Sequence, residues 1–173
     1  RGMGRIQVPQ MRIIGIDPGM ASGAIAMYDG TKLIVEDVPT VTYKASKKNK
    51  TVINLSALSD LFNVFFSGAD HAYIEQVSAM PGQGVTSTFN FGEAYGTLKM
   101  GVAMAGVPYT LIAPVKWKAE MALNSDGEKS RSRALTLFPA ESKFFARKMD
   151  HNRAEAALLA WYGYRMMTVG RVR

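Results

Sequence analysis

Residues 13–19 read Ile13-Ile14-Gly15-Ile16-Asp17-Pro18-Gly19, a β-branched apolar run that ends in an acidic turn. The run predicts a short buried strand over residues 11–16, which leaves Asp17 at its end. A carboxylate in that position is costly to bury unless a positive group or a metal ion offsets its charge. Asp-Pro-Gly also favours a plain turn, so this motif alone does not establish a functional site.

Two further stretches of the sequence also carry acidic residues. Glu75 ends a second apolar run at residues 72–76, and Asp150 and Glu155 open a helical stretch near the carboxyl end. Hard cations such as Mg²⁺ bind carboxylate oxygens. Two of these acids have a simpler interpretation: Glu75 could pair with a lysine, and Asp150 could cap the helix. Taken together, the three stretches predict a metal-dependent site.

Working outward from residues 13–19, the pattern predicts an α/β fold. Residues 22–28 and 32–38 favour strands joined by a turn at Asp29-Gly30, so the chain opens as an antiparallel meander of three strands. The remaining pattern alternates strands with helices, which indicates a mixed five-stranded sheet flanked by helices. Strands are expected at 72–77 and 109–112, helices at 54–66, 91–105, 115–123, 128–137 and 153–167, and mobile loops at 40–51 and 78–88.

Composition narrows the class of protein. The 173 residues fit a single domain at 11–173, preceded by an N-terminal extension or cloning remnant at 1–10. The net charge of +7 favours a polyanionic partner such as nucleic acid. Cysteine is absent, which excludes disulfides and thiolate metal sites and favours an intracellular location. That location would be the bacterial cytoplasm, or the cytoplasm of an infected cell if the chain is viral. No apolar run reaches the ~18 residues of a membrane span.

At residues 14–19, 74–77 and 154–156 the chain resembles the RuvC family of Holliday-junction resolvases, within the RNase H-like superfamily. Its small size fits a phage-type member. The resemblance implies catalytic, metal-binding acids at Asp17 and Glu75, and two more acids three residues apart on the last helix. Glu155 matches the second of these, but Asn152 occupies the first. We expect Asp150 to supply the fourth carboxylate, with Asn152 and His151 as the alternatives.

Basic residues form a second set of candidates. The resemblance implies family basic positions at Val115-Lys116 and at Glu128-Lys129-Ser130, with Lys129 contacting the scissile phosphate or stabilising the transition state. The family often has an aromatic residue near position 78, where this chain has Ser78. Phosphate contact is favoured for Lys129, Arg131 and Arg133 over a merely solvated helix face, whereas the simplest interpretation of residues 44–50 is a disordered basic loop. The basic residues expected to bind nucleic acid are Lys44, Lys47, Lys48, Lys50, Lys116, Lys118, Lys129, Arg131 and Arg133.

The resemblance implies an endodeoxyribonuclease that hydrolyses phosphodiester bonds in branched DNA with two Mg²⁺ ions, for which Mn²⁺ would substitute. A four-way junction is two-fold symmetric, so a homodimer is expected, with the small residues Ala94, Gly101 and Ala105 at its interface. No small-molecule cofactor and no membrane partner are expected. Two alternatives stay open: a nuclease of structured RNA or other replication intermediates, and a nucleic-acid-binding scaffold with weakened catalysis, which Asn152 would explain.

Overall fold

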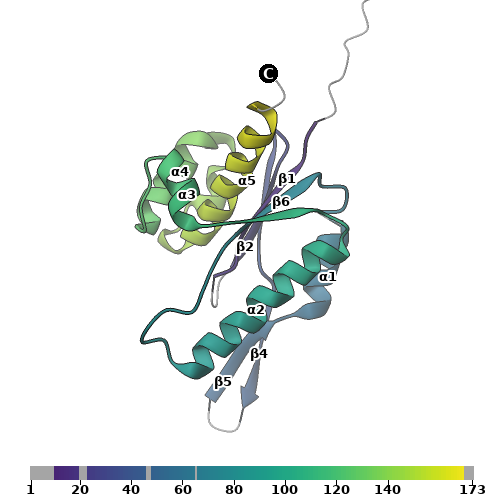
Figure 1. Ribbon diagram of the computed structural model, residues 1–173, viewed down its shortest axis with the longest axis vertical. Coiled ribbons are helices and arrows are strands. Elements are labelled where there is room, and N and C mark those ends of the chain that lie inside the picture. The colour runs from purple at the N-terminus through teal and green to yellow at the C-terminus, as the bar shows by residue number, and fades with distance from the viewer. Residues whose placement is uncertain (1–9, 20–22, 46–47, 65, 170–173) are drawn as a thin grey trace, which may run out of the picture.

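The computed structural model describes residues 10–19, 23–45, 48–64 and 66–169. Its centre is a five-stranded sheet in the order β3-β2-β1-β6-β7 (Figure 1). Strand β1 pairs antiparallel with β2 and parallel with β6, β2 pairs antiparallel with β3, and β6 pairs parallel with β7. The predicted mixed sheet is therefore confirmed. The strands are β1 (Ile13–Asp17), β2 (Ala24–Tyr28), β3 (Leu33–Asp37), β6 (His71–Glu75) and β7 (Tyr109–Ile112).

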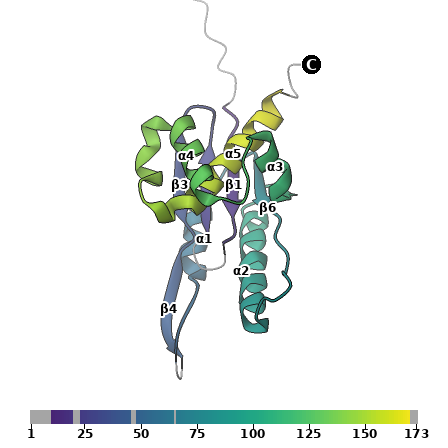
Figure 2. The same ribbon diagram turned by 90° about the vertical axis from the view of Figure 1, so that its left-hand side faces the viewer.

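Helices cover both faces of the sheet. One layer contains α3 (Pro114–Glu120), α4 (Gly127–Leu137) and α5 (His151–Val169), and the other contains α1 (Leu55–Val64) and α2 (Val85–Met104) (Figure 2). Two short 3₁₀ segments, η1 (Pro139–Phe145) and η2 (Lys148–Asp150), connect α4 to α5. Helix α2 begins six residues earlier than the sequence predicts, because residues 85–90 carry no Gly or Pro to prevent helix formation.

Two apolar cores lie on opposite faces of the sheet, because alternate side chains of a strand point to opposite sides. On β2, Ala24 and Ala26 face the core built with α4 and α5. Ile25 and Met27 face the core built with α1 and α2. The smaller residues meet the helix that lies closest to the sheet, so α5 approaches the strands tightly.

Gly15 on β1 permits this close approach. A Cβ placed there would lie 2.2 Å from the carbonyl oxygen of Ala156 and 2.3 Å from the amide nitrogen of Ala160. Contacts this short are sterically forbidden, so only glycine fits while α5 keeps its position. The buried small residues Ala156 and Ala160 complete the close contact from the helix side.

The lysine-rich segment at 40–51 is a β-hairpin, so the predicted mobile loop is wrong. Strands β4 (Thr40–Ala45) and β5 (Lys48–Ile53) pair antiparallel in a separate two-stranded sheet. Thr42 and Thr51, which are register partners, are joined by a 2.8 Å hydrogen bond between their hydroxyl groups. Both strands are rich in β-branched and aromatic residues, and this composition is typical of a strand. We call this hairpin the ribbon.

None of the helices within the described ranges has both the length and the apolar character of a membrane span.

Candidate active site

Asp17 and Glu75 end neighbouring parallel strands. Strand β1 lies beside β6 with Ile16 opposite Ile74, so the carboxylates that follow these two residues leave the sheet at the same edge. Both are buried, with 7% and 9% of their surface exposed. Glu155 lies in the early part of α5 and is equally buried at 8%. Three distant parts of the sequence therefore bring carboxylates to one edge of the sheet.

The electrostatics of the site indicate that these three side chains are close together. Burial raises the pKa of Asp17 to about 8, and the nearby charges of Glu155 and Glu75 contribute to that rise. The Gly19 amide, which donates a 3.1 Å hydrogen bond to Oδ1 of Asp17, opposes the rise in pKa. Burial also raises the pKa of Glu75, against the effect of a hydrogen bond from Trp117. Three carboxyl groups therefore share one buried site, and burial and the two neighbouring charges disfavour the ionised form of Asp17.

Helices α3 and α4 supply the partners of two of these carboxylates. The Trp117 indole Nε1 donates a 2.9 Å hydrogen bond to Oε2 of Glu75. The Lys118 Nζ donates to both oxygens of Glu155, at 2.8 and 2.9 Å, and the Ser130 hydroxyl donates to Oε1 at 2.9 Å. Trp117 and Ser130 are fully buried. Each carboxylate is thus held in a defined orientation.

These partners differ from the residues that the sequence predicts for the site. Lys118 is predicted to bind nucleic acid, whereas in the structure it forms an ion pair with Glu155. Trp117 and Ser130 are not predicted as site residues. One signal was available for Trp117: it is the only aromatic residue in the segment Pro-Val-Lys-Trp-Lys-Ala-Glu, so it had to face the core. Ser130 carried no such signal.

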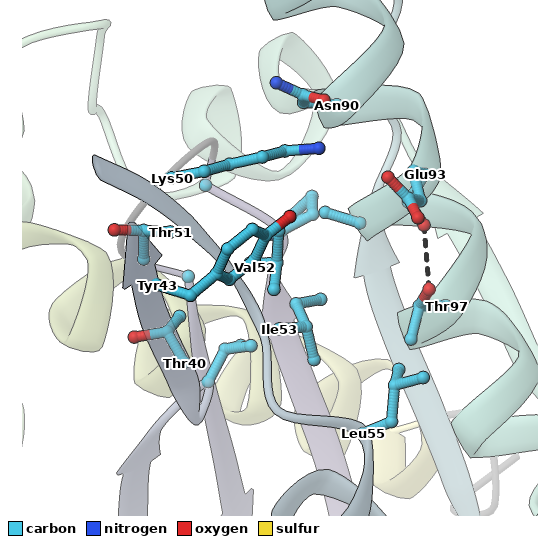
Figure 3. A pocket seen from close by; sticks show the side chains of 15 residues that line it. Thr40, Tyr43, Lys50, Thr51, Val52, Ile53, Leu55, Asn90, Glu93 and Thr97 are labelled. Atoms are coloured by element: carbon cyan, nitrogen blue, oxygen red, sulfur yellow. Dashed lines mark hydrogen bonds between the residues drawn. The ribbon is translucent and has the colours of Figure 1, made fainter. Parts of the chain in front are cut away.

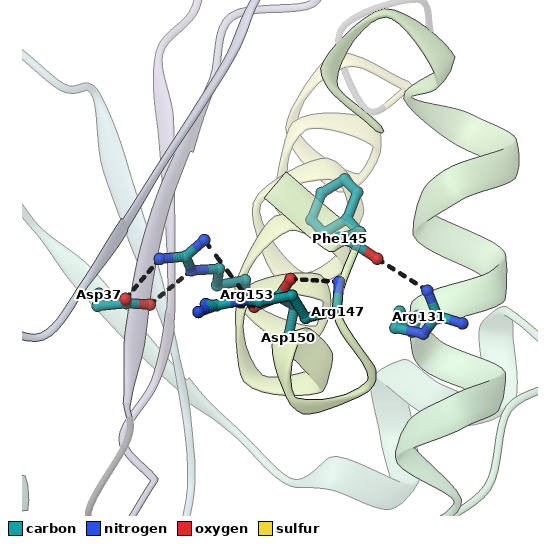
Figure 4. Close-up of polar contacts among 6 residues, drawn as sticks. All are labelled: Asp37, Arg131, Phe145, Arg147, Asp150 and Arg153. Atoms are coloured by element: carbon teal, nitrogen blue, oxygen red, sulfur yellow. Dashed lines mark hydrogen bonds and ion pairs between the residues drawn. The ribbon is translucent and has the colours of Figure 1, made fainter. Parts of the chain in front are cut away.

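The structure does not bring Asp150 to the other carboxylates. Its carboxylate accepts hydrogen bonds from the backbone amide of Arg147 at 2.8 Å and from the guanidinium of Arg147 at 2.7 and 3.0 Å. Arg153 approaches within 3.9 Å and also binds Asp37 through two hydrogen bonds (Figure 4). The hydrogen bonds from Arg147 and the positive charges lower the pKa of Asp150, against the effect of burial. Asp150 thus caps the turn before α5 and links it to β3.

Asn152 and His151, the alternatives to Asp150, point to different places. The Asn152 amide nitrogen would lie 3.3 Å from a Cβ placed on Gly19, so this side chain lies beside the loop that follows Asp17. His151 is exposed and packs against Gly127, where an added Cβ would lie 2.9 Å from the His151 Cβ. Asn152 is therefore the one of these three residues that lies closest to the Asp17 turn.

The remaining basic candidates lie in several places. Lys116 and Lys129 are exposed on α3 and α4, and Lys129 lines a shallow hollow with Leu123 and the half-buried Arg133. Arg131 is held by Glu128 and by the Phe145 carbonyl, to which it donates a 2.8 Å hydrogen bond. The ribbon carries Lys44, Lys48 and Lys50, and Lys47 lies outside the described residues.

The residues at this site fit a divalent cation. Asp17, Glu75 and Glu155 offer hard oxygen donors, and the ammonium of Lys118 partly offsets their mutual repulsion. Within the part of the chain that the structure describes, no three His, Asp or Glu side chains are already arranged as ligands around one point. The reason is visible in the contacts: Glu155 is turned to Lys118 and Ser130, and Glu75 to Trp117.

Comparison with solved structures agrees with this fold. The chain is similar to a T. thermophilus RuvC in complex with a Holliday junction substrate, at 16% identity and a TM-score of 0.59, over 91% of this chain and 97% of that one. It is also similar to another Thermus thermophilus RuvC structure, at 15% identity and a TM-score of 0.54, over 91% and 98%. No protein family model and no curated protein sequence matches the chain. The chain therefore has the RNase H-like fold of RuvC.

Proposed function

We propose that this protein is a metal-dependent, structure-selective endonuclease that hydrolyses phosphodiester bonds in branched DNA, with the four-way junction as its substrate. The observation that carries the proposal is the buried cluster of Asp17, Glu75 and Glu155 at one edge of the sheet. The structural comparison supports the proposal, because a RuvC in complex with a Holliday junction substrate has the same fold. Fold alone does not fix the substrate, so the proposal depends on the site.

In this proposal Asp17, Glu75 and Glu155 hold two Mg²⁺ or Mn²⁺ ions, and Asn152 contributes its amide oxygen. Ions held there would supply activation of the attacking water and neutralisation of charge on the phosphate and leaving oxygen. We assign Asp150 no ligand role, because the guanidinium of Arg147 and the positive charge of Arg153 already hold its carboxylate. Asn152 takes the fourth position, because its side chain lies beside Gly19 in the Asp17 turn.

The protein's own side chains orient this site. Trp117 fixes the direction of the Glu75 carboxylate, and Ser130 fixes that of Glu155. Lys118 places a positive charge where a phosphate would approach Glu155. We therefore transfer to Lys118 the transition-state role first expected of Lys129, because Lys129 is exposed next to a hollow that does not include Glu155.

We further propose a homodimer formed through α2. An apolar groove of about 510 Å³ lies between α1 and α2, with the side chains of Met100 and Met104 59% and 81% exposed along it. Gly96 also lines the groove, with open space where a Cβ would lie, and would allow another helix to approach closely, whereas Gly101 already packs against Phe62 of α1. Two copies related by a two-fold axis would present two active sites to a two-fold symmetric junction.

The decisive test is cleavage of an end-labelled four-way junction compared with a linear duplex of matched arm sequence, in Mg²⁺, Mn²⁺ or chelator. Wild type should produce paired symmetric nicks that require metal, and Asp17→Asn should produce none while still binding the junction. Asp60→Asn removes an exposed acid on α1 and should cleave as wild type does. Equal cleavage of duplex and junction, or cleavage only of structured RNA, would replace the substrate assignment. Junction binding without cleavage in any metal would favour a scaffold.

A further inference from the structure

A groove separates the ribbon from α2. Tyr43, Lys50 and Val52 form its ribbon wall, and Asn90, Glu93 and Thr97 form its helix wall. The last three recur at a spacing of three to four residues and therefore share one face of α2. Its volume is about 250 Å³. We call it the ribbon groove, and Figure 3 shows Tyr43 and Lys50 directed across it toward the helix.

The ribbon groove is continuous with the candidate active site. Pro18, Gly19 and Gly23 line its floor, and the first two directly follow Asp17 in the sequence. A polynucleotide strand whose phosphate lies at Asp17 would therefore meet this groove within the next nucleotides. Glycines on the floor carry no side chains, so a bound strand can approach the backbone closely.

The wall residues have the chemistry of a nucleotide site. Tyr43 and Lys50 are register partners, so their side chains leave the same face of the ribbon side by side. The Tyr43 side chain is 47% exposed although it is aromatic, and so offers a ring face to a ligand. The amide of Asn90 and the carboxylate of Glu93 lie across from them and provide donors and acceptors. Lys44 is one residue out of phase with Tyr43 and projects from the opposite face.

We propose that the ribbon groove binds one unpaired nucleotide of the strand that continues from the active site. Its base stacks on Tyr43, its phosphate binds Lys50, and the base edge contacts Asn90 and Glu93. Aromatic rings and a nearby cation are the usual elements of single-strand binding. The volume lies below the ~300–1,000 Å³ of typical small-molecule pockets, so it suits a single nucleotide and excludes a duplex. This inference builds on the proposed function by naming which part of the branched substrate the protein holds.

Binding of a short single strand tests the proposal. We would measure fluorescence anisotropy with a labelled oligothymidylate of eight nucleotides, using Asp17→Asn protein in chelator so that no cleavage occurs. Tyr43→Ala should weaken binding by about 5- to 100-fold, and Tyr43→Phe should bind as the parent does, because only the ring stacks. Lys50→Ala should reduce the salt slope by about 0.7, whereas Lys143→Ala, at an exposed lysine of η1 that does not line the groove, should leave it unchanged. Melting temperatures must match across the four variants.

Photocrosslinking then locates the nucleotide. A four-way junction carrying one 5-iodouracil at successive positions near the nick should crosslink to Tyr43 from a single position, and Tyr43→Ala should lose that adduct. Equal affinity of Tyr43→Ala and its parent, or crosslinks that avoid the ribbon, would overturn the inference. Preference for a duplex of equal length would overturn it as well.

The two proposals fail separately. Metal-dependent nicking of junctions by wild type, together with unchanged binding by Tyr43→Ala, would leave the nuclease in place and remove the groove site. Tyr43-dependent binding without nicking in any metal would keep the groove site and remove the nuclease.

Discussion

Asp17 keeps its proton at neutral pH in the absence of bound cations, because burial and two neighbouring carboxylates raise its pKa to about 8. In the unfolded chain the same group ionises near pH 3.8. The folded state therefore binds more protons than the unfolded state between these values, and the stability that Asp17 contributes is lost as pH rises across that window.

The melting temperature measured in chelator should consequently fall between pH 5 and pH 8. Asp17→Asn should flatten this dependence, by on the order of 5 °C, because the amide cannot ionise. Mg²⁺ should raise the melting temperature more at pH 8 than at pH 6, since the cation competes with the proton for the same oxygen atoms. A chelator profile that is the same for wild type and Asp17→Asn would contradict the raised pKa.

Trp117 offers a second test at the residue scale. Trp117→Phe removes the indole donor to Glu75 and should lower the junction cleavage rate by about 10- to 100-fold. It should also lower the free energy of unfolding by about 1–3 kcal/mol. The distinguishing measurement is the Mg²⁺ concentration for half-maximal cleavage, which should rise. Trp161→Phe, at a half-buried indole beside Arg165, is the matched control and should leave that concentration unchanged.

The three carboxylates could be found from sequence because each follows or opens an apolar run, which is a local pattern. Their partners could not. Trp117 and Ser130 reach the site only because α3 and α4 pack beside α5, and no local pattern encodes that packing. The preference for Asp150 over Asn152 rests on chemical type alone. The guanidinium groups that hold Asp150 become visible only in three dimensions.

At the scale of elements, the ribbon and its lysines should strengthen binding to DNA by neutralising phosphates. Replacing Lys44, Lys48 and Lys50 together by Ala should reduce the dependence of junction affinity on salt, by ~0.9 in log–log slope for each duplex phosphate that the ribbon no longer neutralises. Replacing Lys32, Lys99 and Lys143 removes equal charge elsewhere and should change the slope less. Equal changes in the two variants would mean that net charge, and not the ribbon, governs binding.

The ribbon also shows why one element was mispredicted. Val41, Tyr43, Lys50 and Val52 share one face of the ribbon. The lysines and threonines of the segment lower its mean hydropathy, so the period-two pattern of a strand is hard to recognise in the sequence. A strand that is exposed on both faces lacks the buried apolar residues from which strands β1 and β2 can be predicted. Strands β1, β2, β3 and β6 and the last helix agree with the prediction because each buries apolar side chains. Strand β7 agrees as well, although only Ile112 of its four residues is buried.

At the scale of the whole molecule, assembly through α2 is open to a direct test. Met100→Asp places a charge in the apolar groove between α1 and α2 and should convert the proposed dimer to a monomer in light scattering. Junction nicking should then lose its symmetry, since only one active site would engage the substrate. Met149→Asp alters a methionine that is 68% exposed on η2 and should leave the mass unchanged. A monomeric wild type that still cuts both strands would remove the dimer from the proposal.

The close approach of Gly15 to α5 has a further consequence for the tolerance of the active centre. Asp17 belongs to the strand and Glu155 to the helix, and the two backbones touch with no side chain between them at this point. The distance between the two carboxylates therefore depends on how closely the backbones of β1 and α5 pack. A single methyl group at position 15 would push α5 away from β1. It would thereby change the spacing of the carboxylates, although residue 15 itself touches neither substrate nor ligand.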